Sequence, residues 1–178
     1  MPVTVSSPLP ILVALVVSFM VLVRTGPAAA LEFETPQALP DVPLLTMEGD
    51  EARLEAHAGE LVVVNFWATW CAPCKREMPS LARLQAEFDP KALKVVTIAV
   101  DRSAPEKIRT FMDEAQAADL PVYRDPKMAT MKGFALKGLP TTLVVDDEGR
   151  IIARHDGYAE WDDPDIVKAL RSHLPSGS

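Results

Sequence analysis

One short segment limits what this chain can fold into more than any other: an apolar strand that runs directly into a helix, with two cysteines at the junction. Residues 61–67 read LVVVNFW, a β-branched and aromatic run typical of a central strand that is covered on both faces. A helix is predicted from about residue 72 to residue 88, and Cys71 and Cys74 open it in a Cys-x-x-Cys pattern. The segment therefore predicts an α/β domain whose chemistry lies at a strand–helix junction.

The rest of the pattern extends this segment into a mixed sheet. A hairpin is expected over residues 44–54, with Gly49 at its turn. Ser103 is the expected N-cap of the helix over 104–117. The other expected elements are strands at 93–100, 120–123, 141–145 and 151–156, and helices at 126–131 and 163–173. Strands that alternate with helices and end in a hairpin and a last helix predict a central mixed β-sheet flanked by helices, with an N-terminal β-hairpin.

The first thirty residues have the composition of an export leader. Residues 2–23 carry no charge, and the most apolar stretch, Ile11–Val23, has the length of a signal peptide rather than of a membrane span. Residues 28–30 are Ala-Ala-Ala, a small-residue cleavage site. No Lys or Arg stands at the start of the leader, so an uncleaved membrane anchor is the alternative. Either form places the folded part outside the cytoplasm.

The remaining chain divides into three parts. Residues 31–41 are rich in proline and are expected to form an irregular linker. Residues 42–174 form the expected domain, and residues 175–178 a frayed tail.

Composition excludes several kinds of site. Asp and Glu number 25 against 18 Lys and Arg, and no run of basic residues is present, which argues against nucleic acid as a partner. Two cysteines cannot fill a four-ligand structural zinc site, and the three His, at 57, 155 and 173, have no metal-ligand spacing. We therefore expect no metal and no cofactor beyond a redox-active disulfide. Cu(I) held by the cysteine pair remains an alternative, because soft thiolates suit that ion.

The positions of the two cysteines predict different roles. Cys71 stands at the helix N-terminus, where unpaired N–H groups and the helix dipole stabilise a thiolate and lower the pKa of the thiol. Cys74 lies one turn further in and is expected to stay a thiol. Cys71 is then the nucleophile that attacks a substrate disulfide, and Cys74 resolves the mixed disulfide. Pro73 stiffens the loop between the sulfurs, and Trp70 is a candidate for the substrate-facing surface.

Glu77 is a candidate catalytic residue. The helical period from Cys74 places it on the apolar, inward-facing stripe with Leu81 and Leu84. Burial would raise the pKa of the carboxyl group, which could then accept or return the proton of Cys74. The alternative is a partly exposed first-turn glutamate that complements the helix dipole or pairs with Lys75 or Arg76.

The segment Leu139-Pro140 precedes the predicted strand at 141–145. A proline directly before a strand, after a glycine-marked loop, is a candidate cis peptide. If this loop packs against the cysteine pair, the proline presents no N–H to the sulfurs.

Taken together, these residues resemble the TlpA/ResA/CcmG-like group of exported thioredoxin-fold proteins. The resemblance covers about residues 42–174 and rests on the leader, on NFWATWCAPCKREMPSL at 65–81 and on KGLPTTLVVDDEGRI at 137–151. It implies a thioredoxin-like fold with an inserted strand and helix between about residues 93 and 131. It also implies that Pro140 is cis and faces the disulfide, and that Glu77 matches the acidic residue that ResA-type members place beside the active site.

The same resemblance carries expectations about activity. It implies a periplasmic thiol–disulfide oxidoreductase that reduces specific exported protein thiols, with Trp70, Pro73, Leu139 and Pro140 as substrate-binding candidates. Its substrates would be apocytochrome c or copper-site proteins, and its electron donor a membrane protein of the DsbD/CcdA kind. One alternative is a general disulfide oxidase, although Ala72-Pro73 lacks the His that oxidases often carry between their cysteines. The other is a non-enzymatic Cu(I)-binding assembly factor.

Overall fold

A mixed β-sheet runs through the part of the chain that the structure describes, and its eight strands lie in the order β1-β8-β7-β4-β5-β6-β2-β3. The structure is a computed structural model that describes Met1, residues 31–54 and residues 60–175. The strands are β1 Phe33–Ala38, β2 Leu44–Leu45, β3 Glu51–Ala52, β4 Leu61–Trp67, β5 Leu93–Ala99, β6 Val122–Arg124, β7 Thr141–Val145 and β8 Arg150–Asp156. Apart from Met1, the predicted leader lies outside the described residues, as do residues 176–178 of the predicted tail.

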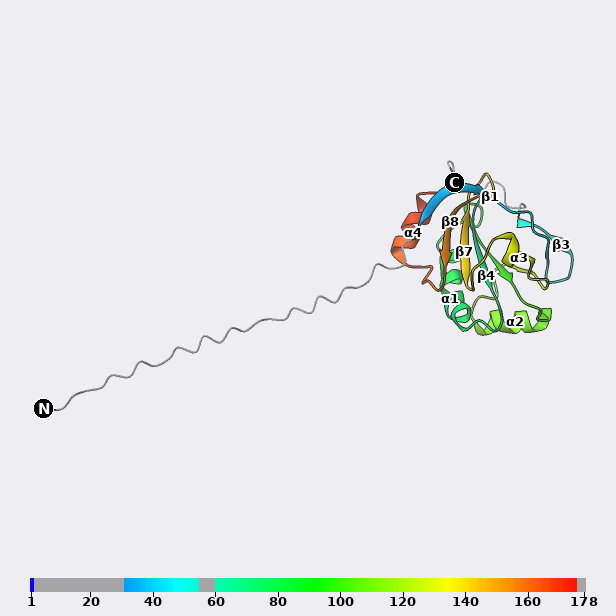
Figure 1. Cartoon of the computed structure of the whole chain (residues 1–178), viewed down its shortest axis with the longest axis horizontal. Coiled ribbons are helices and arrows are strands. Elements are labelled where there is room, and N and C mark those ends of the chain that lie inside the picture. Colours follow the sequence, from blue (N-terminus) through cyan, green and yellow to red (C-terminus); the bar gives the residue numbers. More distant parts are fainter. Residues whose placement is uncertain (2–30, 55–59, 176–178) are drawn as a thin grey trace.

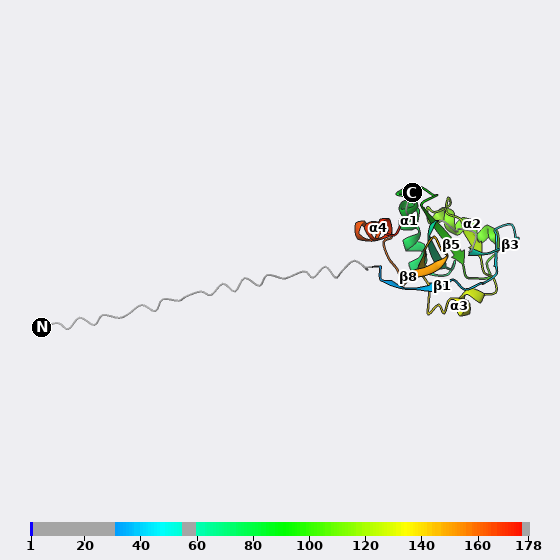
Figure 2. The ribbon, with the colours of Figure 1, turned by 90° about the horizontal axis from the view of Figure 1, so that it is seen from above.

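Helices cover both faces of this sheet, as Figures 1 and 2 show. Within the described residues the helices are α1 Ala72–Ala86, α2 Pro105–Glu114, α3 Ala129–Gly133 and α4 Pro164–Arg171. Helices α1, α2 and α4 share one core, and α3 lies across the opposite face. The prediction of a mixed sheet flanked by helices is confirmed.

Strand β4 lies at the centre of the sheet and is buried along its whole length. It pairs in parallel with β5 and antiparallel with β7. Its side chains alternate between the two cores: those of Leu61, Val63 and Trp67 enter the core beneath α1, while those of Val62, Val64 and Phe66 enter the other. The strand–helix unit that the sequence indicated is therefore the middle of the fold, and α1 begins where β4 leaves the sheet.

The N-terminal hairpin also forms as predicted. Strands β2 and β3 pair antiparallel, and Gly49 in the turn has a φ of +102°, a conformation that glycine adopts without steric penalty.

The predicted linker over residues 31–41 is wrong for most of its length. Phe33–Ala38 form β1, which pairs antiparallel with β8, with Phe33 opposite Ala153 and Gln37 opposite Ile151. Leu31 belongs to the core beneath α1, and Phe33 packs against that core. Most β1 side chains are exposed, so the segment shows no apolar alternation, and its order comes from pairing with an open sheet edge. The folded domain therefore begins before residue 42.

The predicted N-cap of α2 is also wrong. Helix α2 begins at Pro105, and its N-cap residue is Ala104, which makes no side-chain capping hydrogen bond. Pro105 supplies the first turn with a residue that has no N–H to satisfy. The Ser103 hydroxyl instead lies 3.0 Å from the Thr69 hydroxyl, in the loop that leads to the cysteines.

The pairing of β1 with β8 predicts a measurable effect of truncation. A chain that begins at Pro40 should unfold more easily than one that begins at Leu31, by roughly 1.5–3 kcal/mol, the contribution of one buried apolar side chain. Amide hydrogen exchange should accelerate at the β8 positions that face β1. Equal stability and equal protection of the two chains would show that residues 31–39 are only a linker.

Candidate active site

The two cysteines form a disulfide at the start of α1. Cys71 is the N-cap residue, with extended backbone angles, and its sulfur accepts the N–H of Cys74 at 3.3 Å. Cys71 keeps 5% of its surface exposed, whereas Cys74 is completely buried. An incoming sulfur can therefore reach Cys71 but not Cys74, and a negative charge on Cys71 would lie at the positive end of the helix.

The loop that precedes Cys71 is fixed by a carboxylate from the neighbouring strand. Asp101, two residues after the end of β5, accepts the N–H groups of Thr69 and Ser103, both at 2.7 Å. Burial acts to raise the pKa of Asp101, but these hydrogen bonds outweigh it and the pKa is lowered. Asp101 thus stays ionised and holds the two loops together. One sequence signal points to this role: Asp101 follows the predicted strand at 93–100, which lies next to the strand that carries the site.

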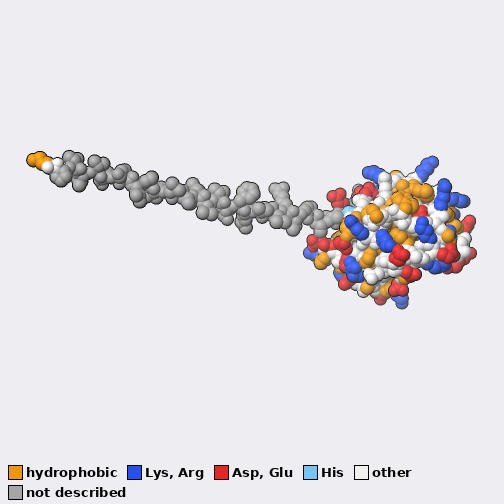
Figure 3. Space-filling view, turned by 90° about the horizontal axis from the view of Figure 1, so that it is seen from below, with side chains coloured by type: hydrophobic (Ala, Val, Ile, Leu, Met, Phe, Trp, Pro, Cys, Tyr) orange, Lys and Arg blue, Asp and Glu red, His pale blue; other side chains and the backbone are white. Residues whose placement is uncertain are grey.

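A groove lies beside this loop. It is wide open to solvent, has a volume of about 680 Å³, and is lined by Trp70, Asp101, Arg102, Ser103, Lys107 and Met128. Trp70 is 67% exposed, in contrast to Trp67, which is buried and stacks on Phe111. Figure 3 shows hydrophobic, basic and acidic side chains interspersed over one face of the molecule, so that face has no large area of a single charge. An exposed indole beside a nearly buried sulfur suits contact with a protein surface.

Glu77 lies in the core, as the helical period predicted, and not at an exposed first-turn position. Its Oε1 accepts the Asn65 side-chain N–H at 2.6 Å, and its Oε2 accepts the Ala159 backbone N–H at 3.3 Å and the Trp161 indole N–H at 3.4 Å. Burial raises the pKa of Glu77 to about 7, against the lowering effect of these three hydrogen bonds. Glu77 can therefore exchange a proton near neutral pH. Among the described residues, no hydrogen bond joins its carboxyl group to either sulfur.

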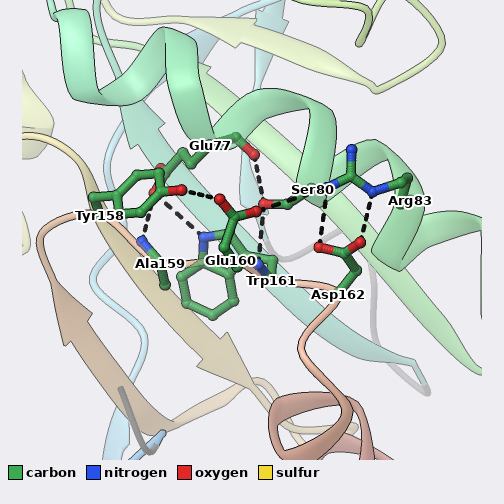
Figure 4. A network of polar contacts seen from close by, with 8 residues as sticks. All are labelled: Glu77, Ser80, Arg83, Tyr158, Ala159, Glu160, Trp161 and Asp162. Atoms are coloured by element: carbon green, nitrogen blue, oxygen red, sulfur yellow. Dashed lines mark hydrogen bonds and ion pairs between the residues drawn. The ribbon is translucent and has the colours of Figure 1, made fainter. Parts of the chain in front are cut away.

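Two of these donors come from the loop between β8 and α4, which is fastened to α1 (Figure 4). The Ser80 hydroxyl donates to the Glu77 carbonyl oxygen at 2.7 Å and accepts the Trp161 backbone N–H at 3.0 Å. Further along the helix, Arg83 pairs with Asp162 at 2.6 Å. No local sequence pattern indicates this loop, because its residues lie more than 75 positions from their partners on α1.

The peptide bond between Leu139 and Pro140 is cis, as the sequence suggested. Pro140 is buried and Leu139 is half-buried. Because Thr141 pairs with Phe66 near the end of β4, Pro140 lies at the end of the central strands where the chain turns into the cysteine loop. The carbonyl oxygen of Pro140 accepts the Gly157 N–H at 2.9 Å, so the proline loop is joined to the loop that supplies the Glu77 donors.

The structure brings most of the predicted site residues to the same end of the central strands. Cys71, Cys74 and Glu77 lie on the first two turns of α1, and the cis proline lies next to the end of β4. Pro73 is exposed between the cysteines. In residues 31–54 and 60–175, no cluster of three or more His, Cys, Asp or Glu side chains could hold a metal ion. None of the helices in those ranges is long and apolar enough to cross a membrane.

Comparison with known proteins adds independent findings. Residues 35–154 match the AhpC/TSA family. The thioredoxin-like protein YneN of Bacillus subtilis is 35% identical over 125 residues, which cover 68% of this chain and 71% of that protein. The thiol-disulfide oxidoreductase ResA of Halalkalibacterium halodurans is 31% identical over 112 residues and 62% of each chain. The chain thus spans somewhat less than two thirds of that ResA protein.

A solved structure gives the same result at the level of the fold. A Chlorobium tepidum protein assigned as a thiol:disulfide interchange protein DsbE superposes with a TM-score of 0.65. The two are 27% identical in sequence, and the match covers 80% of this chain and 96% of that one.

The burial of Glu77 predicts a pH-dependent stability. Its pKa rises from 4.5 to about 7 on folding, so the folded state binds a proton more tightly than the unfolded state, and the free energy of unfolding falls as pH rises through that interval. Relative to wild type, Glu77→Gln should gain stability between pH 4.5 and pH 8, by up to roughly 3 kcal/mol. Denaturant titrations at several pH values measure this difference. The matched variant Glu87→Gln removes an exposed carboxyl group at the end of the same helix and serves as the control for the loss of one charge. A constant offset for Glu77→Gln across this pH range would contradict the argument.

Proposed function

This chain belongs to the AhpC/TSA family and is a thiol–disulfide oxidoreductase of the ResA and DsbE type, and we propose that it reduces disulfides of specific exported proteins. The observation that carries the proposal is the unequal burial of the cysteine pair beside a buried carboxyl group. Cys71 is reachable, Cys74 is completely buried, and Glu77, with a pKa of about 7, lies one turn further along the same helix.

In this proposal the reduced protein acts first through Cys71. The Cys71 thiolate attacks one sulfur of a substrate disulfide, a new S–S bond forms between them, and the second substrate sulfur leaves as a thiolate that takes up a proton. The helix N-terminus stabilises the attacking thiolate. The reaction so far leaves the substrate covalently attached to Cys71.

The second step releases the substrate. Cys74 loses its proton, and the Glu77 carboxylate is the proposed acceptor. The Cys74 sulfur attacks the Cys71 sulfur, the bond to the substrate breaks, and the substrate leaves with two electrons and both thiols reduced. The protein is left with the Cys71–Cys74 disulfide that the structure contains. A dithiol donor must then reduce this disulfide before another turnover.

The substrate would contact the surface around Cys71. Trp70 precedes that residue and Pro73 follows it, and both are exposed. Leu139, the residue before the cis Pro140, is half-buried. A proline at this position presents no N–H to a sulfur, which would leave the sulfur free for exchange. These four residues are the proposed substrate-binding surface.

The proposed location is the periplasm, reached through the apolar leader, whose residues 2–23 carry no charge, as a cleaved signal peptide or as a membrane anchor. The proposed substrates are apocytochrome c or copper-site proteins, and the proposed electron donor is a membrane protein of the DsbD/CcdA kind. The similarity to ResA and DsbE proteins supports this assignment.

The reduction potential of the Cys71–Cys74 couple tests the direction of electron flow. Equilibration with redox buffers at pH 7 should give a value near or below about −220 mV, as expected for a reductase. A value near about −120 mV would identify an oxidant and overturn the proposal. Tight stoichiometric Cu(I) binding by the reduced protein, without reduction of Cys-pair peptides, would point instead to a copper assembly factor.

Substitution of each cysteine tests the assigned roles. Cys71→Ser should abolish reduction of a disulfide peptide, because Cys74 is buried. Cys74→Ser should retain attack and accumulate a mixed disulfide with the peptide, because the resolving thiol is missing. Mass spectrometry of the non-reduced protein detects the adduct. Full activity of Cys71→Ser, or accumulation of the adduct on that variant alone, would reverse the assignment.

A further inference from the structure

Asn65 connects the buried carboxyl group of Glu77 to strand β7. It lies near the end of β4, is completely buried, and pairs with Thr142 in the sheet. Its side-chain nitrogen lies 2.6 Å from Glu77 Oε1 and 2.8 Å from Thr142 Oγ1. Its side-chain oxygen is buried and has no hydrogen-bond partner among the described residues. The amide therefore makes two contacts through one end and none through the other.

The surroundings of Glu77 determine where a proton on its carboxyl group can be bound. Oε2 faces the N–H groups of Ala159 and Trp161, which donate and cannot accept. A proton must therefore reside on Oε1, and among the described residues the polar group that faces Oε1 is the Asn65 amide. With the nitrogen of Asn65 in that place, the carboxyl O–H has no acceptor, and an unsatisfied buried hydroxyl costs about 1–3 kcal/mol.

We propose that the side-chain amide of Asn65 rotates when Glu77 takes up a proton, so that its oxygen and nitrogen exchange places. Asn65 is then a positioning residue for proton transfer during thiol–disulfide exchange. In the turned orientation Asn65 Oδ1 accepts the Glu77 O–H and the Thr142 O–H. The distances of 2.6 and 2.8 Å suit O–H···O hydrogen bonds as well as they suit the bonds of the other orientation. No bond within the amide is made or broken. An O–H bond forms on Glu77 as the bond between that proton and the group that supplied it breaks, and the reverse happens when the proton is returned.

The two orientations differ in what they leave unpaired. Each makes two hydrogen bonds, but the first leaves the amide oxygen without a partner among the described residues, whereas the turned one leaves the two amide N–H hydrogens there. Only the O–H of protonated Glu77 gives the turned orientation a hydrogen bond that the first orientation cannot make. The charge on Glu77 therefore decides between them. The Thr142 hydroxyl, two residues after the cis Pro140, changes from acceptor to donor at the same time. Protonation of Glu77 on α1 thus also changes a hydrogen bond close to the proline loop.

Few other ionisable groups face this pair. Cys74 lies one turn earlier on α1, and Glu160, on the loop after β8, acts through its charge to raise the pKa of Glu77. His155 on β8 packs perpendicular to the Trp161 ring, and burial lowers its pKa, which disfavours a positive charge there. Asn65 itself does not titrate and can serve both forms of Glu77, which a leucine at this position could not do.

The sequence makes the test direct, because Asn65 is the only asparagine in the chain. Selective ¹⁵N-asparagine labelling of the oxidised protein gives one side-chain NH₂ signal. At pH values above the midpoint of the Glu77 titration, the Asn65 NH₂ protons should show nuclear Overhauser effects to Thr142. At pH values below that midpoint these effects should disappear. The change should have the same midpoint, near pH 7, as the titration of the Glu77 carboxyl ¹³C shift. If the effects to Thr142 persist unchanged while Glu77 titrates, the proposal is wrong.

Glu77→Gln provides the fixed reference state. Its amide must keep its oxygen toward the Ala159 and Trp161 N–H groups, so its nitrogen donates toward Asn65 and requires the turned orientation. The Asn65 signal of this variant should therefore lack the contacts to Thr142 at every pH. Contacts to Thr142 in Glu77→Gln would contradict the inference, independently of any variant at position 65.

Substitutions at position 65 test the positioning role, which rests on Glu77 acting as the proton acceptor proposed above. Asn65→Leu removes the donor to the carboxylate and the acceptor of the carboxyl O–H. Because the hydrogen bond to the charged form is the stronger of the two, the Glu77 midpoint and the pH profile of mixed-disulfide resolution should both move upward, with a tenfold slower rate below the midpoint for each pH unit. Thr97→Val, which removes a buried threonine hydroxyl at the paired position on β5, should lower stability and leave both midpoints unchanged.

The outcomes separate this inference from the function on which it rests. A shifted carboxyl midpoint with an unshifted rate profile shows that Glu77 is not the proton acceptor, and the positioning role of Asn65 falls with it. If the Asn65 amide keeps one orientation while the protein still reduces disulfides by the same mechanism, the rotation of Asn65 is wrong and the proposed oxidoreductase function stands. Movement of the amide, the carboxyl midpoint and the rate profile together supports the proposal.

Discussion

A carboxyl group in a dry core needs hydrogen-bond donors, and the arrangement around Glu77 meets that need from several separate parts of the fold. Strand β4 supplies the Asn65 amide, and the loop after β8 supplies the Ala159 and Trp161 N–H groups. Without such donors a buried carboxyl group is strongly disfavoured. The contacts of that loop with α1, through Ser80 and Arg83, follow from the same requirement, because they hold the donors in place.

The start of α1 places its two sulfurs, only a few residues apart, in different environments. Cys71 is a helix cap, slightly exposed and close to unpaired backbone N–H groups, so its charged form is favoured. Cys74 is sealed in the core on the same side of the helix as Glu77. A thiol in that position ionises poorly without a base, because burial disfavours charge. The same burial that suppresses ionisation of Cys74 also raises the pKa of Glu77 toward neutrality, which suits a base that must release its proton afterwards.

The sequence was informative where structure follows from local pattern. The apolar run of β4 and the helical period that follows it were sufficient to predict the strand–helix junction, the enclosure of Cys74 and the burial of Glu77. Pattern was uninformative where order comes from distant partners. Strand β1 is mostly exposed and is ordered by an edge of β8, and the donors to Glu77 from the β8–α4 loop come from residues 82 and 84 positions away. Ser103 looked like a helix cap, but its hydroxyl lies beside that of Thr69, an arrangement visible only once β4 and β5 lie side by side.

The identity of residue 65 has a physical consequence for the whole site. An aspartate there would place a second carboxyl group about 2.6 Å from Glu77, and two such groups share one proton and titrate as a coupled pair. An asparagine leaves one ionisable group among the polar side chains that meet beneath the cysteines, so proton uptake in this part of the core is confined to Glu77. The amide also offers both a donor and an acceptor, so it can match whichever form of the carboxyl group is present. Deep burial of Glu77 is therefore compatible with reversible protonation, because its principal partner has no charge of its own and can reverse its hydrogen-bonding sense.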